Sequence, residues 1–264
     1  TIMRQAASCL YGLAPLLDDF IKKRTDAIIQ DGELYESECE ISDIEIDFIV
    51  SLSNTITEFI RKLPQEDPKF DKILDIIKNK NCEQNNKIIV FSSFKHTLNY
   101  LNRRLQMYNV RVGQITGNIK DEERREISKR FHLDKNEKDA IDVLLFTEVG
   151  CEGLDYQFCD TMINYDLPWN PMRIEQRIGR IDRRGQKSDF VQIHNIITEG
   201  TIDAAIYDRC LFKIGVFQAS IGDCAEILGE VTDQIMQIMF DSSLTEDERM
   251  MRLEKIADND IMRA

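Results

Sequence analysis

Five short apolar segments in the middle of the chain alternate with longer, more polar ones. The five are nearly continuous and rich in β-branched residues, and they lie at 87–93, 110–116, 141–147, 161–167 and 191–197. Such runs are typical of strands that are buried on both faces of a parallel sheet. The stretches at 95–108 and 121–131 have helical periodicity and are long enough for right-handed crossovers between the first three strands. The pattern predicts an α/β domain with a doubly wound, mostly parallel sheet.

Helical periodicity flanks this central region on both sides. Apolar residues recur at helical spacing in 6–20 and again in 49–63. The stretch 31–47 between them carries eight acidic residues and no Lys or Arg, which is typical of a solvated loop. A further helical stretch follows the last strand at 201–217. We therefore expect three parts, which are a helical segment at 1–66, an α/β lobe at 67–217 and a helical C-terminal extension at 218–264.

The net charge of the chain excludes one class of function. Its 264 residues include 34 Lys and Arg against 47 Asp and Glu, which gives a formal net charge of -13. A protein of this charge is not a polycation that binds nucleic acid nonspecifically. Basic residues still cluster at 124–130 and 173–187, so one surface of an acidic body can meet phosphates.

Cysteine usage and hydropathy bound the compartment. The seven cysteines include no C-x-x-C pair and no His at metal-ligand spacing, which indicates free thiols in a reducing compartment. We expect each cysteine to be a small buried side chain, and we expect no metal site. No run reaches the roughly 18 apolar residues of a membrane span. The chain begins at Thr1 rather than Met, which indicates a piece of a longer protein.

The richest concentration of candidate chemistry is the string QRIGRIDRRGQ at 176–186. A helix over 172–183 would place Gln176, Arg180 and Arg183 on one face, at i, i+4 and i+7. Planar guanidinium groups donate several N–H bonds to delocalised negative charge, so they suit the oxygens of a transferring phosphoryl group. The alternative is a basic solvated helix, because three further arginines of the segment occupy its other faces. Periodicity does not choose between the two.

The same string, with YDLPWNP before it at 165–171, resembles motif VI of the superfamily-two helicases, in the form used by Swi/Snf-type DNA translocases. Three upstream segments resemble other motifs of the family, in the family's order and spacing. They are KIIVFSSF at 87–94 for motif IV, GNIKDEERREISKRF at 117–131 for the block after motif IV, and LLFTEVGCEGLDYQ at 144–157 for motif V. The form EGLDYQ is closer to the bacterial RNA-polymerase-recycling (RapA-like) type than to eukaryotic chromatin remodellers. The resemblance covers about 67–217 and implies a RecA-like fold, as the second, C-terminal lobe of a two-lobe motor.

The resemblance also implies roles for residues of motifs V and VI. Arg180 and Arg183 would be arginine fingers that reach ATP bound mainly by the other lobe, and Gln176 would position the nucleotide or the attacking water. Gly153 and Asp155 would lie at the ATP-binding cleft between the lobes. For Gly153 the alternative is an ordinary turn between a strand and a helix.

Nucleic-acid contacts are expected where the strands end, because ligands of doubly wound sheets collect at the carboxyl edge. Ser92, Ser93 and Lys95 follow the first strand, and the resemblance implies that they contact the nucleic-acid backbone. The alternative for these residues is simple capping of the following helix. Thr147 ends the third strand, where its hydroxyl and nearby backbone N–H groups would hold a further phosphate.

An ATPase of this class also needs a Walker A loop, and its G-K pair does not occur in the sequence. The only string like Walker B, DEER at 121–124, opens a predicted helix. We therefore expect one lobe of a motor whose parent chain hydrolyses ATP with Mg²⁺, translocates on double-stranded DNA and remodels nucleoprotein complexes. The isolated chain would be inactive. The expected partners are the N-terminal RecA-like lobe of the same protein, double-stranded DNA and RNA polymerase or another DNA-bound protein, with no membrane, in the bacterial cytoplasm at the nucleoid.

Two other functions remain open from the sequence. An RNA helicase of the DEAD-box kind has a similar second lobe, although such helicases usually have His where Gln176 stands. A noncatalytic interaction module would use the acidic helices at either end to bind a partner protein, with the motifs as relics. The intact set of Gln176, Arg180 and Arg183 disfavours this second alternative.

Overall fold

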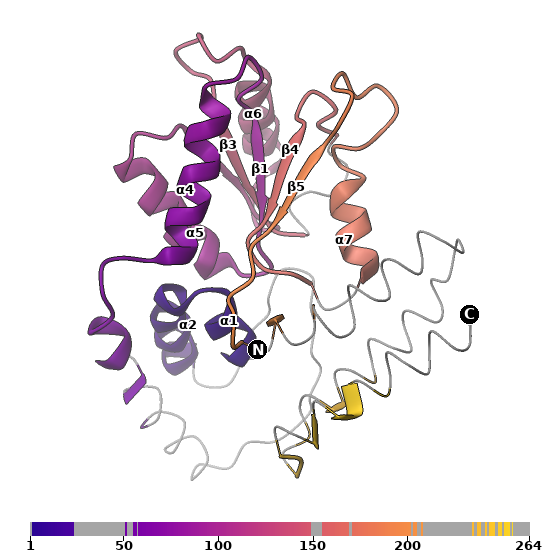
Figure 1. Cartoon of the computed structure of the whole chain (residues 1–264). Coiled ribbons are helices and arrows are strands. Elements are labelled where there is room, and N and C mark those ends of the chain that lie inside the picture. Colours follow the sequence, from indigo (N-terminus) through magenta and orange to yellow (C-terminus); the bar gives the residue numbers. More distant parts are fainter. Residues whose placement is uncertain are drawn as a thin grey trace. The chain divides into compact units, whose positions relative to one another are not determined.

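A computed structural model describes most of the chain (Figure 1). The described residues are 2–23, 51, 55–56, 58–148, 155–168, 171–201, 203–204, 207, 234, 237–238, 241, 243–245, 248–249, 251–253 and 255. The predicted acidic loop at 31–47 and most of the C-terminal extension at 218–264 lie outside them. The chain divides into two compact units, Thr1–Tyr165 with Arg180–Ile196, and Asp166–Gly179 with Ile197–Ala264.

The first unit is built on a five-stranded parallel sheet. In chain order its strands are β1 (Ile88–Phe91), β2 (Val112–Ile115), β3 (Val143–Phe146), β4 (Thr161–Asn164) and β5 (Gln192–Asn195). Their order across the sheet is β2-β3-β1-β4-β5, and every pair is parallel. In the register of the central strand, Ile88 lies opposite Val143 on one side and Thr161 on the other. All five predicted strands and the predicted parallel sheet are confirmed.

The burial of the strands depends on their place in the sheet. Every residue of β1, β3 and β4 is buried, as apolar runs predict. The residues of β2 alternate between buried and half-buried, and those of β5 are half-buried or exposed. The expectation that all five strands are buried on both faces is wrong for β2 and β5, because these two form the edges of the described sheet.

Helices cover both faces of the sheet. Three helices of the first unit that lie on the sheet are α4 (Pro68–Asn81), α5 (Lys95–Met107) and α6 (Asp121–His132). Asp67 caps α4 by accepting hydrogen bonds from the N–H groups of Lys69 (3.0 Å) and Phe70 (3.1 Å). The predicted helices at 95–108 and 121–131 agree with α5 and α6 to within one residue at each end.

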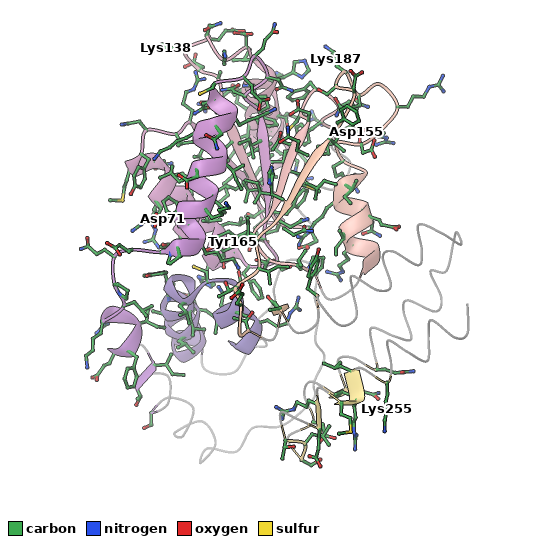
Figure 2. All side chains as sticks on the ribbon, in the orientation of Figure 1. Asp71, Lys138, Asp155, Tyr165, Lys187 and Lys255 are labelled. Atoms are coloured by element: carbon green, nitrogen blue, oxygen red, sulfur yellow. The ribbon has the colours of Figure 1, made fainter. Side chains whose placement is uncertain are left out.

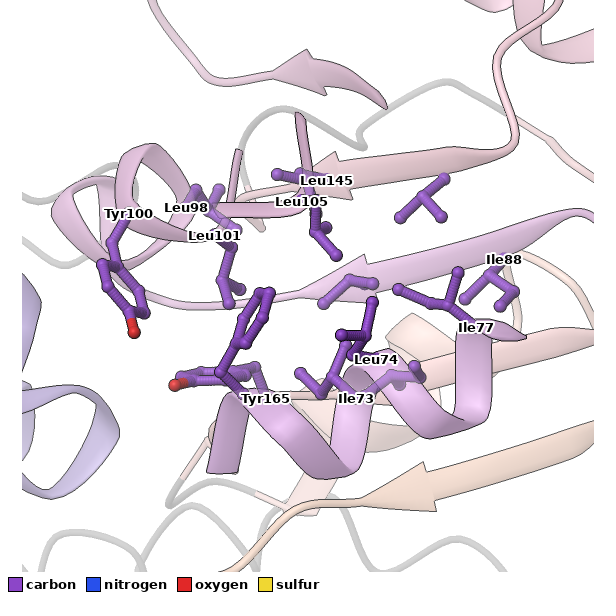
Figure 3. Close-up of a cluster of buried hydrophobic side chains, with 14 of the residues drawn as sticks. Ile73, Leu74, Ile77, Ile88, Leu98, Tyr100, Leu101, Leu105, Leu145 and Tyr165 are labelled. Atoms are coloured by element: carbon purple, nitrogen blue, oxygen red, sulfur yellow. The ribbon is translucent and has the colours of Figure 1, made fainter. Parts of the chain in front are cut away.

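One large apolar core fixes α4 and α5 on the same face of the sheet. Figure 3 shows its side chains from α4, α5 and the central strands, including Ile73, Leu74, Ile77, Ile88, Leu98, Leu101, Leu105 and Leu145. On the other face, the ring of Phe131 from α6 contacts that of Tyr156, and Tyr156 contacts the ring of Phe146. The ring centroids are 5.5 Å apart in each pair. Burial of each large apolar side chain stabilises the fold by about 1.5–3 kcal/mol, so these contacts hold the sheet that positions the site.

Two N-terminal helices, α1 (Ile2–Ser8) and α2 (Leu10–Lys23), belong to the same unit as the sheet. Gln5 Nε2 donates to Thr97 Oγ1 (2.8 Å) at the start of α5. The ring of Tyr11 stacks on that of Tyr100, with centroids 5.2 Å apart. The helical periodicity at 6–20 is confirmed, although Cys9 divides it between α1 and α2. Of the predicted apolar face, Leu13 and Leu17 are buried in a small cluster with Ala6, Ile56 and Ile60, whereas Leu10 is exposed.

At Gly113 of β2 the side chain of Ile127 from α6 lies close against the sheet. A Cβ atom there would lie 2.9 Å from Ile127 Cγ2, 2.9 Å from Ile141 Cδ1 and 3.1 Å from Leu144 Cδ1. We expect Gly113→Ala to lower the free energy of unfolding by about 1–3 kcal/mol, as overpacking does, measured by denaturant unfolding. Gly179→Ala is the matched control, because its Cβ would meet no atom closer than 3.4 Å. Equal losses in the two variants would contradict this account.

The expectation of buried cysteines holds for two of the three that the structure places. Cys9 and Cys159 are buried, and burial raises the pKa of Cys9 to about 11 and that of Cys159 to about 12. Both therefore remain neutral thiols at physiological pH. Cys82 is exposed, so the expectation is wrong there, because this residue caps the solvent end of α4.

Candidate functional site

The loops that follow β1 and β3 meet at the carboxyl edge of the sheet. The N–H of Ser92 donates to the carbonyl oxygen of Phe146 (3.1 Å), which carries the parallel pairing past the end of β1. Ser93 Oγ donates to Glu148 Oε1 (3.4 Å). Ser92, Ser93 and Thr147, which the sequence predicted separately, therefore lie at one edge.

The predicted nucleic-acid residues differ in accessibility. Ser92 and Thr147 are fully buried, Ser93 is nearly so, and Lys95 is exposed. Ser92 Oγ accepts a hydrogen bond from the N–H of Phe94 (3.1 Å), and Phe94 itself gives α5 no side-chain cap. Ser92 therefore shapes the turn into α5, and Lys95 is the member of the set whose side chain reaches solvent.

Glu148 is a neighbour that the sequence did not single out. Its carboxylate accepts the hydrogen bond from Ser93, so a negative charge lies beside that hydroxyl. A phosphate placed directly on Ser93 would be repelled by this charge. Lys95, at the first turn of α5, is the better placed of the two for an anion because the helix N-terminus adds its own positive potential.

The motif VI arginines do not lie on a helix. α7 (Pro171–Ile178) ends before them, so the expected helix at 172–183 and its shared face are wrong. Beyond the helix end, the carbonyl oxygen of Arg180 accepts a hydrogen bond from the N–H of Tyr156 (3.0 Å). The carbonyl oxygen of Ile181 accepts one from Gln186 Nε2 (2.9 Å). These bonds, with Gly179 at the helix end, replace the helical pattern by turns.

Gln176 is exposed on α7, in the second unit, and is described apart from the arginines. In the same helix Arg177 donates from Nη1 to the carbonyl oxygen of Asp166 (2.9 Å). Its Nη2 lies 3.9 Å from Asp166 Oδ1. Arg177 therefore stabilises the loop before α7, which distinguishes it from a solvated basic side chain.

Motifs V and VI meet in the first unit through Asp155 and Arg183. The side chain of Asp155, labelled in Figure 2, forms an ion pair with Arg183 Nη1. The two side chains are 39% and 51% exposed, so this pair contributes about 1 kcal/mol or less. Arg180 is half-buried. The structure thus brings Asp155, Arg180 and Arg183 together, whereas Gly153 lies outside the described residues.

Gln186 organises the loop that carries the arginines. Its Nε2 donates to the carbonyl oxygens of Cys159 and Ile181, at 2.9 Å each. Its Oε1 accepts from the N–H of Ser188 (3.0 Å). Gly185 before it has φ +104°, a conformation that favours glycine. The sequence assigned Gln186 no role, and its position after this glycine at the end of the motif was the available signal.

The described residues include hydrogen-bond donors that could bind a phosphate, but no cluster of metal-binding side chains. None of the His, Cys, Asp and Glu side chains that the structure places forms a group of three or more that could hold a metal ion. Within the same part of the chain, no helix is long and apolar enough to cross a membrane. An accessible cation at the site is the guanidinium of Arg183, which pairs with the Asp155 carboxylate.

Comparison with known proteins finds one family model and several relatives that match this chain. Residues 68–185 match the family described as helicase conserved C-terminal domain. The chain is 33% identical over 210 residues to the uncharacterized ATP-dependent helicase YqhH of Bacillus subtilis, covering 77% of this chain and 36% of that protein. It is 33% identical over 174 residues to the RNA polymerase-associated protein RapA of Photobacterium profundum, covering 66% and 17%. It is 32% identical over 161 residues to the DNA excision repair protein ERCC-6-like of Bos taurus, covering 61% and 13%.

A solved structure supports the fold. The crystal structure of the C-terminal part of the Fun30 ATPase domain matches with a TM-score of 0.51 at 17% identity, covering 97% of this chain and 80% of that one. The chain spans between 13% and 36% of the length of the three curated relatives above. The predicted RecA-like fold and the resemblance to Swi/Snf-type proteins are both confirmed. The chain therefore carries the helicase conserved C-terminal domain, and its relatives include Swi/Snf-type ATPases of helicase superfamily two.

Proposed function

We propose that this chain is the C-terminal motor lobe of an ATP-dependent double-stranded DNA translocase that remodels nucleoprotein complexes. The observation that carries the proposal is the junction of motifs V and VI, where Asp155 pairs with Arg183 and the N–H of Tyr156 bonds to the Arg180 carbonyl. This junction presents two guanidinium groups on one short loop. Relatives named as an ATP-dependent helicase and as an RNA polymerase-associated protein support the same assignment.

The arginines fit a polyphosphate. Arg183 is half exposed, and its ion pair with Asp155 is a weak surface one, so its guanidinium can exchange a carboxylate for a phosphate at little cost. Arg180 and Arg183 would bind the γ-phosphate oxygens and stabilise the charge that builds there, an effect worth about 10³–10⁵ in rate. Gln176 would position the nucleotide or the attacking water, and Gly153 with Asp155 would line the cleft. ATP with Mg²⁺, held mainly by an N-terminal RecA-like lobe, supplies the transferable phosphoryl group.

The nucleic-acid backbone would contact the carboxyl edge of the sheet. Lys95 supplies an exposed charge there, while the buried Ser92, Ser93 and Thr147 shape the loops. Only a few phosphates would be neutralised, so binding by this lobe should be weak and should decrease with salt. An acidic chain with a formal net charge of -13 gains nothing from nonspecific attraction, which favours such a local contact.

The remaining partners follow from the motor assignment. The N-terminal lobe of the same longer protein would complete the ATP site, since the sequence holds no G-K pair for a Walker A loop. RNA polymerase or another DNA-bound protein is the proposed target, in the bacterial cytoplasm at the nucleoid. The 264-residue chain alone is then expected to hydrolyse no ATP.

Steady-state ATP hydrolysis by the longer protein tests the proposal. We expect double-stranded DNA to stimulate hydrolysis, single-stranded RNA to have little effect, and the 264-residue chain to be inactive under every condition. Stimulation by RNA alone would favour an RNA helicase. Absence of hydrolysis with either nucleic acid would favour a noncatalytic interaction module.

A further inference from the structure

We propose that Gln186 is the positioning residue for the two motif VI arginines, a role that rests on the proposed function. The two arginines need a positioning residue because α7 ends at Ile178, so this helix does not orient Arg180 or Arg183. Both lie in turns, where the backbone depends on other contacts to hold a fixed path. Whatever fixes residues 180–186 therefore fixes where the guanidinium groups point.

Gln186 bonds to two backbone carbonyls of the arginine loop and to one outside it. Ile181, which lies between the two arginines, is fully buried, and its carbonyl accepts a hydrogen bond from Gln186 Nε2 (2.9 Å). The backbone N–H of Gln186 donates to the carbonyl oxygen of Arg183 (2.9 Å). The second bond from Nε2 reaches Cys159 (2.9 Å), a buried residue just before β4. One residue thus ties the arginine loop to itself and to the sheet.

A second anchor follows directly after Gln186. The Gln186 side chain accepts the N–H of Ser188 (3.0 Å), and Ser188 Oγ donates to Asp160 Oδ2 (3.1 Å). Asp160 Oδ1 in turn lies 2.7 Å from Nζ of Lys80, a buried residue of α4. Burial alone would lower the pKa of Lys80, but its hydrogen bonds to Asp160 and Glu83 raise it, so the cation persists. The loop is therefore held against α4 as well as against β4.

Phosphoryl transfer depends on the accurate position of the groups that bind the phosphoryl oxygens. Misplacement of a catalytic group by about 1 Å can cost about 10²-fold in rate. Loss of Gln186 would leave the carbonyls of Cys159 and Ile181 without this donor and would let the arginine loop move. The Arg180 carbonyl would still receive the N–H of Tyr156, so the fold of the lobe should survive.

The first measurement uses the 264-residue chain and does not depend on catalysis. Amide hydrogen exchange by NMR compares wild type, Gln186→Ala and the matched control Gln192→Ala, whose side chain is exposed on β5. We expect the Ser188 amide to exchange at least about 10-fold faster in Gln186→Ala and to be unchanged in the control. An unchanged exchange rate in Gln186→Ala would overturn the proposed anchoring.

The second measurement separates positioning from general destabilisation in the longer protein. We expect Gln186→Ala to lower kcat for ATP hydrolysis by about 10–100-fold, with the KM for ATP changed less than about twofold. Tm should fall by at most about 4 °C. Gln186→Glu keeps the length but cannot donate to two carbonyls, so it should not restore kcat. An unchanged kcat, or full activity in Gln186→Glu, would overturn the role.

The two measurements distinguish the failure of this inference from that of the motor assignment. If the wild-type longer protein hydrolyses no ATP, the motor assignment fails, and with it the effect of Gln186 on catalysis through the arginines. The exchange of Ser188 then decides alone whether Gln186 anchors the loop. If the wild-type protein is active and Gln186→Ala has the same kcat as wild type, the motor assignment stands and the positioning role is wrong.

Discussion

Replacement of Arg180 by alanine is expected to reduce DNA-stimulated ATP hydrolysis of the longer protein by at least about 10³-fold. The guanidinium supplies several N–H donors to the phosphoryl oxygens, and alanine supplies none. The backbone path is retained, because the Arg180 carbonyl accepts its hydrogen bond from Tyr156 whatever the side chain. Steady-state turnover should therefore fall while Tm changes by less than about 2 °C.

Two further variants make this result specific. Arg184→Ala is the matched control, because Arg184 is an exposed arginine of the same loop for which the motif implies no role. It should retain most of the activity. Arg180→Lys keeps the positive charge but loses the planar fork, so it should remain strongly impaired. If Arg180→Ala kept more than a tenth of wild-type turnover, the arginine-finger assignment would be wrong.

The largest effect on stability is expected at Arg111, beside the start of β2. Its guanidinium bonds to both carboxylate oxygens of Asp142, at 2.8 and 2.5 Å, and the bond to Asp142 raises the pKa of Arg111. It also donates to the carbonyl oxygens of Glu137 and Lys135, at 2.8 Å each. In Arg111→Ala the carboxylate of Asp142, which is only 10% exposed, would lose these hydrogen bonds and keep the one from Asn86 Nδ2.

We expect Arg111→Ala to lower the free energy of unfolding by about 3 kcal/mol, because the variant removes the cation that is hydrogen-bonded to a partly buried carboxylate. For a chain of this size the loss corresponds to a fall in Tm of about 6–12 °C, measured by calorimetry. Arg103→Ala is the control, since Arg103 is exposed on α5 and makes one bond, to the carbonyl oxygen of Asn99 (3.3 Å). Similar Tm values for the two variants would show that the Arg111 network contributes little.

The strands were predictable because their apolar runs are local signals. In β1, β3 and β4 every residue is buried, and the runs at 87–93, 141–147 and 161–167 predicted all three. The exposure of β5 was not predictable in this way. Periodicity reports the composition of a strand, whereas its position at an edge depends on the order β2-β3-β1-β4-β5, which is set by packing between distant segments.

The candidate site shows the same division between local and distant causes. The motif pattern indicated Asp155 and Arg183 as members of one site, and the structure pairs them. The expected helix through Arg180 fails because its backbone partners, Tyr156 and Gln186, come from outside the helical pattern of 172–178. Spacing along a chain carries no information about donors that arrive from another motif.

The N-terminal helices have a consequence for any motor that contains this lobe. The Tyr11 hydroxyl donates to the carbonyl oxygens of Pro64 (2.7 Å) and Glu66 (3.0 Å), and Arg104 donates to that of Gln65 (3.2 Å). The backbone leading into α4 is thus hydrogen-bonded at three successive residues, 64–66, by side chains of α2 and α5. We therefore expect a lobe transferred from one protein to another to keep its stability only if residues 2–23 are transferred with it.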